Sequence, residues 1–97
     1  MLYEYEDPFL IKKVDDAALQ KLEDEALQQA QKLGITDDLY KKQYVQAYVY
    51  VQIAKRNIEA DGMKDKYEIY SKELDRIYDL AKTNSPSNFY TITVGRG

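Results

Sequence analysis

Apolar side chains are densest in the middle of the chain, from residue 44 to residue 54. Gln46 and Gln52 interrupt this run, and neither is charged. A helix that is apolar on most of its circumference has to be enclosed on several sides. The surrounding segment carries no turn signal, whereas strands rarely exceed about 10 residues. We therefore expect a long central helix, capped by Thr36 and ended by Gly62, with the flanking segments packed around it.

A helix is predicted before the central one. It starts at Asp15 or Asp16, either of which can cap it, and Gly34 supplies a left-handed stop. Its apolar stripe has spacings of three and four residues and consists of Leu19, Leu22, Ala26, Ala30 and Leu33. Polar residues between them, Glu23 included, are expected to face water.

Another helix is predicted after the turn at Asp61-Gly62, from Lys64 to Lys82. Its stripe, again at spacings of three and four, consists of Tyr67, Tyr70, Leu74, Ile77 and Ala81. The fold class expected from these patterns is all-α: a three-helix bundle around a long central helix, over residues 14–83.

Residues 1–13 are expected to form an extended arm. They contain Pro8 and no helical period, and Tyr3 and Tyr5 alternate with acidic residues. The segment Phe9–Ile11 is expected to tuck against the core. A frayed terminus is the alternative for residues 1–7.

Residues 84–97 are predicted to form a C-terminal tail that begins with a breaker-rich loop around Pro86. A β-strand and partner-binding segment follows, made of Phe89, Tyr90, Thr91, Ile92, Thr93 and Val94. A lone strand leaves backbone groups unpaired, so it must find an edge. That edge is either the arm at residues 2–5 or a neighbouring or partner protein, and the flexible hinge favours the second. The alternative is a tail that is disordered when the partner is absent.

Tyrosines recur along one face of the central helix, at Tyr40, Tyr44 and Tyr48. Such a ladder can stack nucleic-acid bases. Its neighbours are mostly apolar, however, so tyrosines of the core and of a subunit interface are favoured. The candidate interface residues are Tyr44, Tyr48 and Tyr70.

The chain contains no His and no Cys. It therefore lacks the usual general base, thiolate metal ligands and disulfides. We expect no catalytic, cofactor-binding or metal-binding residues, and thus no enzyme. No apolar run is long enough for a membrane span, and the acidic N-terminus differs from a signal peptide, so a cytosolic protein is expected.

The net charge of −3 is unevenly distributed. Residues 1–40 carry ten acids and four bases, and residues 41–97 carry seven acids and ten bases. Ordinary solubility charge explains this imbalance, and so does head-to-tail complementarity between identical subunits in a ring. Neither half has the basic face of a sequence-specific DNA-binding protein.

The layout as a whole resembles a known family. Its elements come in a fixed order. An acidic first helix is followed by a Tyr/Ala-rich second helix (Tyr40 to Ala60) and a loop at Asp61-Gly62. A Lys/Tyr/Glu-rich third helix (Lys66 to Ala81) and an extended tail complete the chain. Over residues 14–97 this order resembles the head–tail connector (adaptor or head-completion) proteins of tailed bacteriophages and prophages.

The resemblance implies a virion structural protein made in the host cytoplasm. Such subunits form a homo-oligomeric ring, usually a dodecamer, below the portal at the head–tail junction. Their tails dock onto the portal or onto neighbouring neck or tail proteins, and DNA passes through the channel without sequence-specific binding. The alternative is a cytosolic helical adaptor that binds a partner helix or peptide in a groove beside the central helix.

Overall fold

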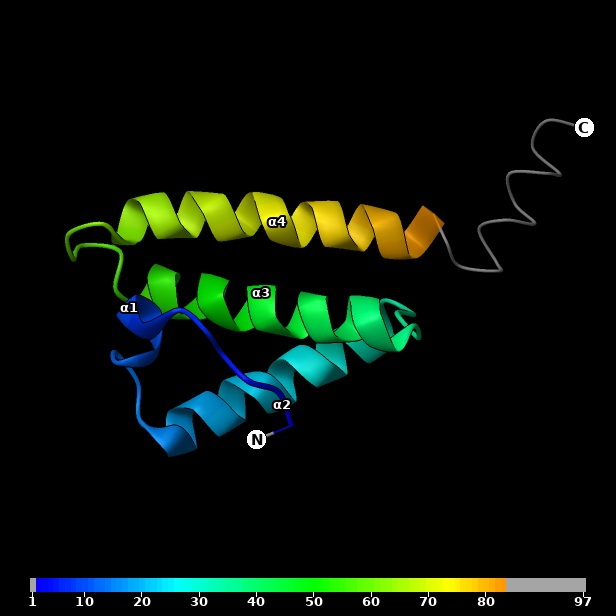
Figure 1. The fold of residues 1–97 in the computed structure, drawn as a ribbon, viewed down its shortest axis with the longest axis horizontal. Coiled ribbons are helices and arrows are strands. Elements are labelled where there is room, and N and C mark those ends of the chain that lie inside the picture. The colour runs from blue at the N-terminus through cyan, green and yellow to red at the C-terminus, as the bar shows by residue number, and fades with distance from the viewer. Residues whose placement is uncertain (1, 84–97) are drawn as a thin grey trace, which may run out of the picture.

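Helix α3 (Asp38–Arg56) runs through the middle of the computed structural model, with α2 (Asp16–Lys32) and α4 (Met63–Thr83) on either side (Figure 1). A one-turn helix, α1 (Pro8–Ile11), packs against α3 near the start of α4 (Figure 1). The structure describes residues 2–83. This part of the chain is an all-α bundle of four helices, three of them long, which confirms the expected all-α class.

Both ends of α3 differ from the prediction. The N-cap is Asp37, whose Oδ1 accepts the backbone N–H of Tyr40 at 3.0 Å, so the predicted cap at Thr36 was wrong. The helix also ends at Arg56, well before Gly62. Asn57 follows, and its side-chain Nδ2 donates to a backbone carbonyl at 2.8 Å. An Asn side chain that bonds the backbone in this way competes with further helix, which explains the early stop.

The two ends of α2 follow the prediction. The N-cap is Asp15, whose Oδ1 accepts the N–H of Ala18 at 2.7 Å. At the other end Gly34 has a φ of +76°. The N–H of Ile35 donates to the carbonyl of Ala30 at 3.0 Å, and both side chains are buried in one cluster. This is a Schellman ending, in which glycine avoids the strain of a left-handed residue. Leu33, expected in the stripe, is exposed.

The core of the described residues consists of two clusters that follow one another along the bundle. The larger lies toward the α1 end and contains Leu10, Leu19, Leu22, Ala26, Val45, Val49, Tyr50, Ile53, Ala54 and Met63. The smaller lies toward the C-terminal end of α4 and contains Ala30, Ile35, Tyr44, Ala47, Ile77 and Ala81. Since α3 contributes to both clusters, it connects the two halves of the bundle.

The arm is not extended throughout, because α1 interrupts it. Asp7 caps this turn and Pro8 occupies its first position, where a missing N–H costs nothing. Leu10 is fully buried, and Phe9 and Ile11 pack against the core, as expected of this anchor. The ring of Phe9 lies 3.4 Å from where a side chain on Gly62 would begin, and Gly62 has a φ of +83°. The positive φ favours glycine at this position, whereas the contact with Phe9 is an ordinary van der Waals distance.

The predicted strand Phe89–Val94 and the rest of the predicted tail lie outside the described residues. Within residues 2–83, no helix is both long and apolar enough to cross a membrane.

Candidate functional site

The beginning of the N-terminal arm is held by one buried carboxylate on α2. Glu23 is 1% exposed. It accepts the backbone N–H groups of Leu2 at 2.7 Å and Tyr3 at 3.1 Å, and the hydroxyl of Tyr5 at 2.7 Å. The expectation that Glu23 faces water was therefore wrong. Three donors from the arm replace the water that the carboxylate loses on burial.

These hydrogen bonds keep Glu23 ionised. Burial alone would raise the pKa of Glu23, but the bonds from Leu2, Tyr5 and Tyr3 outweigh it and hold the pKa below its ordinary value. The pKa of the Tyr5 hydroxyl is raised by burial and by its bond to Glu23. At neutral pH the contact is therefore a charged acceptor with a neutral phenol donor, which is the strong form of such a bond.

The middle of the arm is bound by side chains of α3. Nε2 of Gln46 donates to the backbone carbonyl of Glu4 at 2.7 Å. The hydroxyl of Tyr50 accepts the N–H of Glu6 at 2.7 Å, and the rings of Tyr5 and Tyr50 meet edge to face with centroids 6.0 Å apart. The arm thus lies on the bundle as a peptide ligand would, through its backbone and its aromatic side chains.

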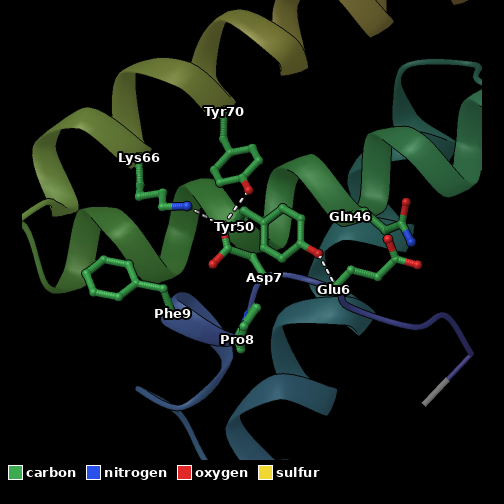
Figure 2. Close-up of a pocket in the computed structure, with 8 residues that line it drawn as sticks. All are labelled: Glu6, Asp7, Pro8, Phe9, Gln46, Tyr50, Lys66 and Tyr70. Carbon is green, nitrogen blue, oxygen red and sulfur yellow. Dashed lines mark hydrogen bonds and ion pairs between the residues drawn. The ribbon is translucent and has the colours of Figure 1, made fainter.

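The end of the arm is tied to α4 through Asp7 (Figure 2). Asp7 is 8% exposed. Its Oδ2 accepts Nζ of Lys66 at 2.8 Å and the hydroxyl of Tyr70 at 2.5 Å, and its Oδ1 accepts the N–H of Leu10 at 3.2 Å. The Tyr70 ring packs on Tyr50 with centroids 4.6 Å apart. One carboxylate therefore joins the arm, α1 and α4.

The same balance of burial and bonding sets the charge of this cluster. Burial opposes ionisation of Asp7, but Lys66, Tyr70 and the Leu10 amide lower its pKa below the ordinary value. Burial and the bond to Asp7 raise the pKa of Tyr70. A carboxylate with a lowered pKa and with both oxygens occupied is a poor general base. The cluster is built to hold the arm in place.

A cavity of about 520 Å³ opens beside this cluster (Figure 2). It is lined by Glu6, Asp7, Pro8, Phe9, Gln46, Tyr50, Lys66 and Tyr70. Nζ of Lys66 lies 5.7 Å from the centroid of the Phe9 ring, so the lysine makes a cation–π contact with an aromatic side chain of the cavity wall. Residues 2–83 contain no group of three or more acidic, His or Cys side chains that could hold a metal ion.

A second hollow, of about 170 Å³, follows the seam between α3 and α4. It is lined by Gln43, Gln46, Ala47 and Tyr50 from α3, and by Tyr70, Glu73 and Ile77 from α4. It shares Gln46, Tyr50 and Tyr70 with the cavity at Asp7. The two hollows are therefore neighbours, and we call the second one the seam groove.

The tyrosines predicted at a subunit interface lie in different surroundings. Tyr44 is 4% exposed in the core, and burial raises its pKa to about 12. Tyr48 is half-buried, with its ring centroid 6.2 Å from that of Tyr44. Tyr70 is half-buried and bonded to Asp7. Their role at an interface stays a prediction, and Tyr48 and Tyr70 have the exposed ring surface that it requires.

The net positive charge of the second half comes mainly from α3. Lys41 and Lys42 are near its start, and Lys55 and Arg56 are at its end. Helix α4 contains five acids and five bases.

Two functional residues were missed by sequence reasoning, and each carried a signal. Glu23 lies four residues after Leu19 and three before Ala26, so it belongs to the buried stripe by position although its charge suggested the surface. Asp7 directly precedes Pro8, which is the pattern of a helix cap followed by a first-turn proline. Nothing local indicated that the arm would supply the partners of Glu23, or that α4 would supply those of Asp7.

Known proteins offer no assignment for this arrangement. Neither the protein-family models nor the curated proteins or solved structures contain a match to the chain. The function is therefore argued from the geometry.

Proposed function

We propose that the chain is a structural subunit of a phage head–tail connector, which forms a ring below the portal and docks through its C-terminal tail. The observation that carries this proposal is that residues 2–83 close a core by themselves. No buried side-chain nitrogen or oxygen among them lacks a hydrogen-bond partner. A core that is complete without residues 84–97 leaves those residues available for a partner.

The hydrogen bonds that the N-terminal arm already makes also support a tail that is available for a partner. The strand at residues 89–94 needs an edge, and the arm was one of two candidates. Side chains of the bundle already bond the N–H groups of Leu2, Tyr3 and Glu6 and the carbonyl of Glu4. Pairing the tail with this arm would require breaking those bonds. A partner protein is therefore the favoured source of the edge.

The shape of the bundle suits a ring of side-by-side subunits. Helices α2 and α4 form its two outer edges, with α3 between them (Figure 1). A contact from the α2 edge of one subunit to the α4 edge of the next would be heterologous, and heterologous contacts form a ring when the rotation between subunits closes. Exposed acids of α2, such as Asp16 and Asp24, would repel phosphate if they faced the channel and would let DNA slide.

The test compares the full chain with a chain that ends at Asn88. Each is mixed with the portal protein encoded beside it, and mass is measured by size-exclusion chromatography with light scattering. The full chain is expected to form a ring with the portal. The shortened chain should keep its helicity and melting temperature but fail to assemble. A full-length control with residues 89–97 in scrambled order separates tail sequence from tail length.

Two outcomes would contradict the proposal. One is a full chain that stays monomeric or dimeric at every concentration and in the presence of the portal. The other is a gene neighbourhood without portal or capsid genes.

The second candidate function is a helical adaptor that binds a partner helix or peptide. The seam groove favours it, because Gln43, Ala47 and Ile77 form a hollow directly beside the central helix. A stable monomer that binds a peptide in this groove, with no response to a portal, would support the adaptor over the connector.

A further inference from the structure

Helix α4 carries a second line of side chains besides the buried stripe that packs on α3. This line consists of Ile69, Glu73, Arg76 and Leu80, at spacings of four, three and four residues. At 3.6 residues per turn, the four positions fall within about a sixth of the helix circumference. Spacings of this kind form the contact seam between paired helices. We call this line the outer stripe.

Both ends of the outer stripe are apolar and exposed. Ile69 is 59% exposed and Leu80 is 36% exposed. Three helical turns, or about 17 Å, separate them along α4. This helix forms one outer edge of the bundle, so a helix of another molecule can lie along it (Figure 1). Single exposed apolar side chains are normal on a protein surface, so the residues between them decide what this edge can contact.

The middle of the outer stripe is a charged pair. Nε of Arg76 donates to Oε2 of Glu73 at 3.2 Å, and Nη2 of Arg76 donates to Oε1. Both side chains are about half exposed. A guanidinium has five N–H donors and a carboxylate accepts about four hydrogen bonds, so each group can also bond a second partner of opposite charge. The middle of the stripe therefore offers one site of each sign.

The order of residues in the outer stripe is self-complementary. Ile69 and Leu80 are centred on the peptide bond between residues 74 and 75, and Glu73 and Arg76 are centred on the same bond. A two-fold axis at this point would set a second copy of α4 antiparallel to the first. Ile69 would then contact Leu80 of the second copy, and Glu73 would face Arg76 of the second copy. A parallel pair would instead place like charges together.

We infer that the free chain forms a two-fold dimer through the outer stripe, with the two α4 helices antiparallel. Ile69 and Leu80 make an apolar contact at each end, and four charges of alternating sign meet in the middle. The bonds between Glu73 and Arg76 within each chain stay in place, so association breaks none of them. A contact along one helix falls below the roughly 1,200 Å² of standard interfaces, so the expected dissociation constant is on the order of 100 µM.

This inference goes beyond the connector function and does not rest on it. The ring contact described above also uses the α4 edge, so a ring would have to replace the dimer. The two-fold contact closes at two subunits, whereas a contact from α2 to α4 continues to further subunits. The mass of the chain alone therefore tests the dimer, and its mass with the portal tests the connector.

Sedimentation velocity of the full chain alone measures the association, at concentrations on both sides of the expected dissociation constant. A shift from monomer to dimer is expected, without larger species. Ile69→Asp should keep its helical circular dichroism, because the position is exposed, and should weaken the dimer about tenfold or more by placing a carboxylate against Leu80. Ile58→Asp is the matched control, since Ile58 is also exposed but lies beyond the end of α3.

The control should dimerise like the unchanged chain. Three results would overturn the inference: a chain that is monomeric at every concentration, species larger than the dimer, or equal weakening by Ile69→Asp and Ile58→Asp.

An exchange of charges tests the middle of the stripe. Arg76→Glu would bring two carboxylates together at each charged contact and Glu73→Arg would bring two guanidinium groups together, so each variant alone should stay monomeric. In an equal mixture of the two variants every carboxylate again faces a guanidinium, and a dimer with one chain of each kind should form. Circular dichroism of each variant checks that the helices are intact. A mixture that stays monomeric would show that these two residues do not meet.

Disulfide formation tests the direction of the helices. The sequence contains no Cys, so Ile69→Cys and Leu80→Cys each introduce a single thiol. The two variants are oxidised separately and as a mixture. A crosslink is expected only in the mixture, because the antiparallel pair brings position 69 of one copy to position 80 of the other and keeps identical positions about three turns apart. Efficient crosslinking of Ile69→Cys with itself would mean a parallel pair and would contradict the two-fold arrangement.

Discussion

The N-terminal arm and the centre of α3 are fixed to the same bundle by opposite means. The arm donates hydrogen bonds from its backbone and a hydroxyl to the buried carboxylate of Glu23, and its own buried carboxylate, Asp7, accepts from Lys66 and Tyr70 of α4. The centre of α3 is held by apolar contact, with Val49 and Ile53 fully buried. Apolar burial is spread over many atoms, whereas the arm depends on a few directional bonds.

This difference predicts two kinds of failure. Damage to the centre of α3 should unfold the bundle as a unit, because both core clusters include residues from this helix. Damage to the carboxylates should release the arm first, because local segments with few apolar contacts open before the core does. Each of the following experiments tests that distinction.

The largest effect is expected from Val51→Asp. Val51 is 8% exposed on α3, and a carboxylate there would be buried without a partner. Such a charge costs several kcal/mol, a large part of the 5–15 kcal/mol typical of a small domain. The variant should lose its helical circular dichroism at 25 °C. Gln52→Asp, at the half-buried neighbouring position, is the control and should stay folded. A cooperatively folded Val51→Asp protein would contradict the description of this face.

Acid should weaken both arm contacts together. The native pKa values of Asp7 and Glu23 are lowered from ordinary values of 3.8 and 4.5. Groups of this kind stabilise the fold above their ordinary pKa and lose that effect as the pH falls through the native pKa. Melting temperature should therefore be level down to about pH 5 and fall below it. The protein with both Asp7→Asn and Glu23→Gln should show a shallower fall, and an equally steep one would assign the acid response to other groups.

Asp7→Asn should cost about 2 to 3 kcal/mol in the free energy of unfolding. The neutral amide cannot form an ion pair with Lys66, and in either orientation its NH₂ group would face donors, on Lys66 and Tyr70 or on the Leu10 amide. Urea unfolding measures the loss. Asp15→Asn is the matched control, because Asp15 also caps a helix and Asn caps nearly as well, so its effect should be small. Similar losses for the two variants would mean that Asp7 acts only as a cap.

Glu23→Gln should have a smaller effect on global stability, about 1 to 2 kcal/mol, and a distinct local one. Gln keeps one acceptor oxygen, and the freed amides of Leu2 and Tyr3 can return to water. Their hydrogen exchange should become fast while that of Val49 stays slow. Glu25→Gln, two positions along α2, is the control and should leave both the global stability and the exchange of the Leu2 and Tyr3 amides unchanged. Fast exchange at Val49 as well would show that the arm and the core open as one unit.

Rules based on neighbouring residues predicted the presence of the helices better than the residues at which they begin and end. The stripe from Leu19 to Ala30 and the glycine at position 34 placed α2 correctly, because spacing and a left-handed stop are properties of neighbouring residues. The start of α3 was misplaced because Thr36 and Asp37 are both good caps, and only the geometry distinguishes them. The end of α3 before Asn57 depends on one side-chain hydrogen bond that the sequence pattern does not predict.

The arm contacts were beyond local rules. Asp7 meets Lys66 and Tyr70, which lie far away along the chain. Glu23 was assigned to water on charge alone, although its position in the stripe pointed inward. A buried carboxylate is stable only with donors in place, and those donors come from another segment that a sequence pattern cannot bring near.

The bridge from Asp7 to α4 also has a consequence for synthesis. Lys66 and Tyr70 are made long after Asp7 has left the ribosome, since 59 and 63 residues separate them from it. The first segment to emerge can therefore meet Glu23 and α3 early, but it completes its contacts only when α4 has been made. A chain stalled before Lys66 would lack the tie from Asp7 to α4.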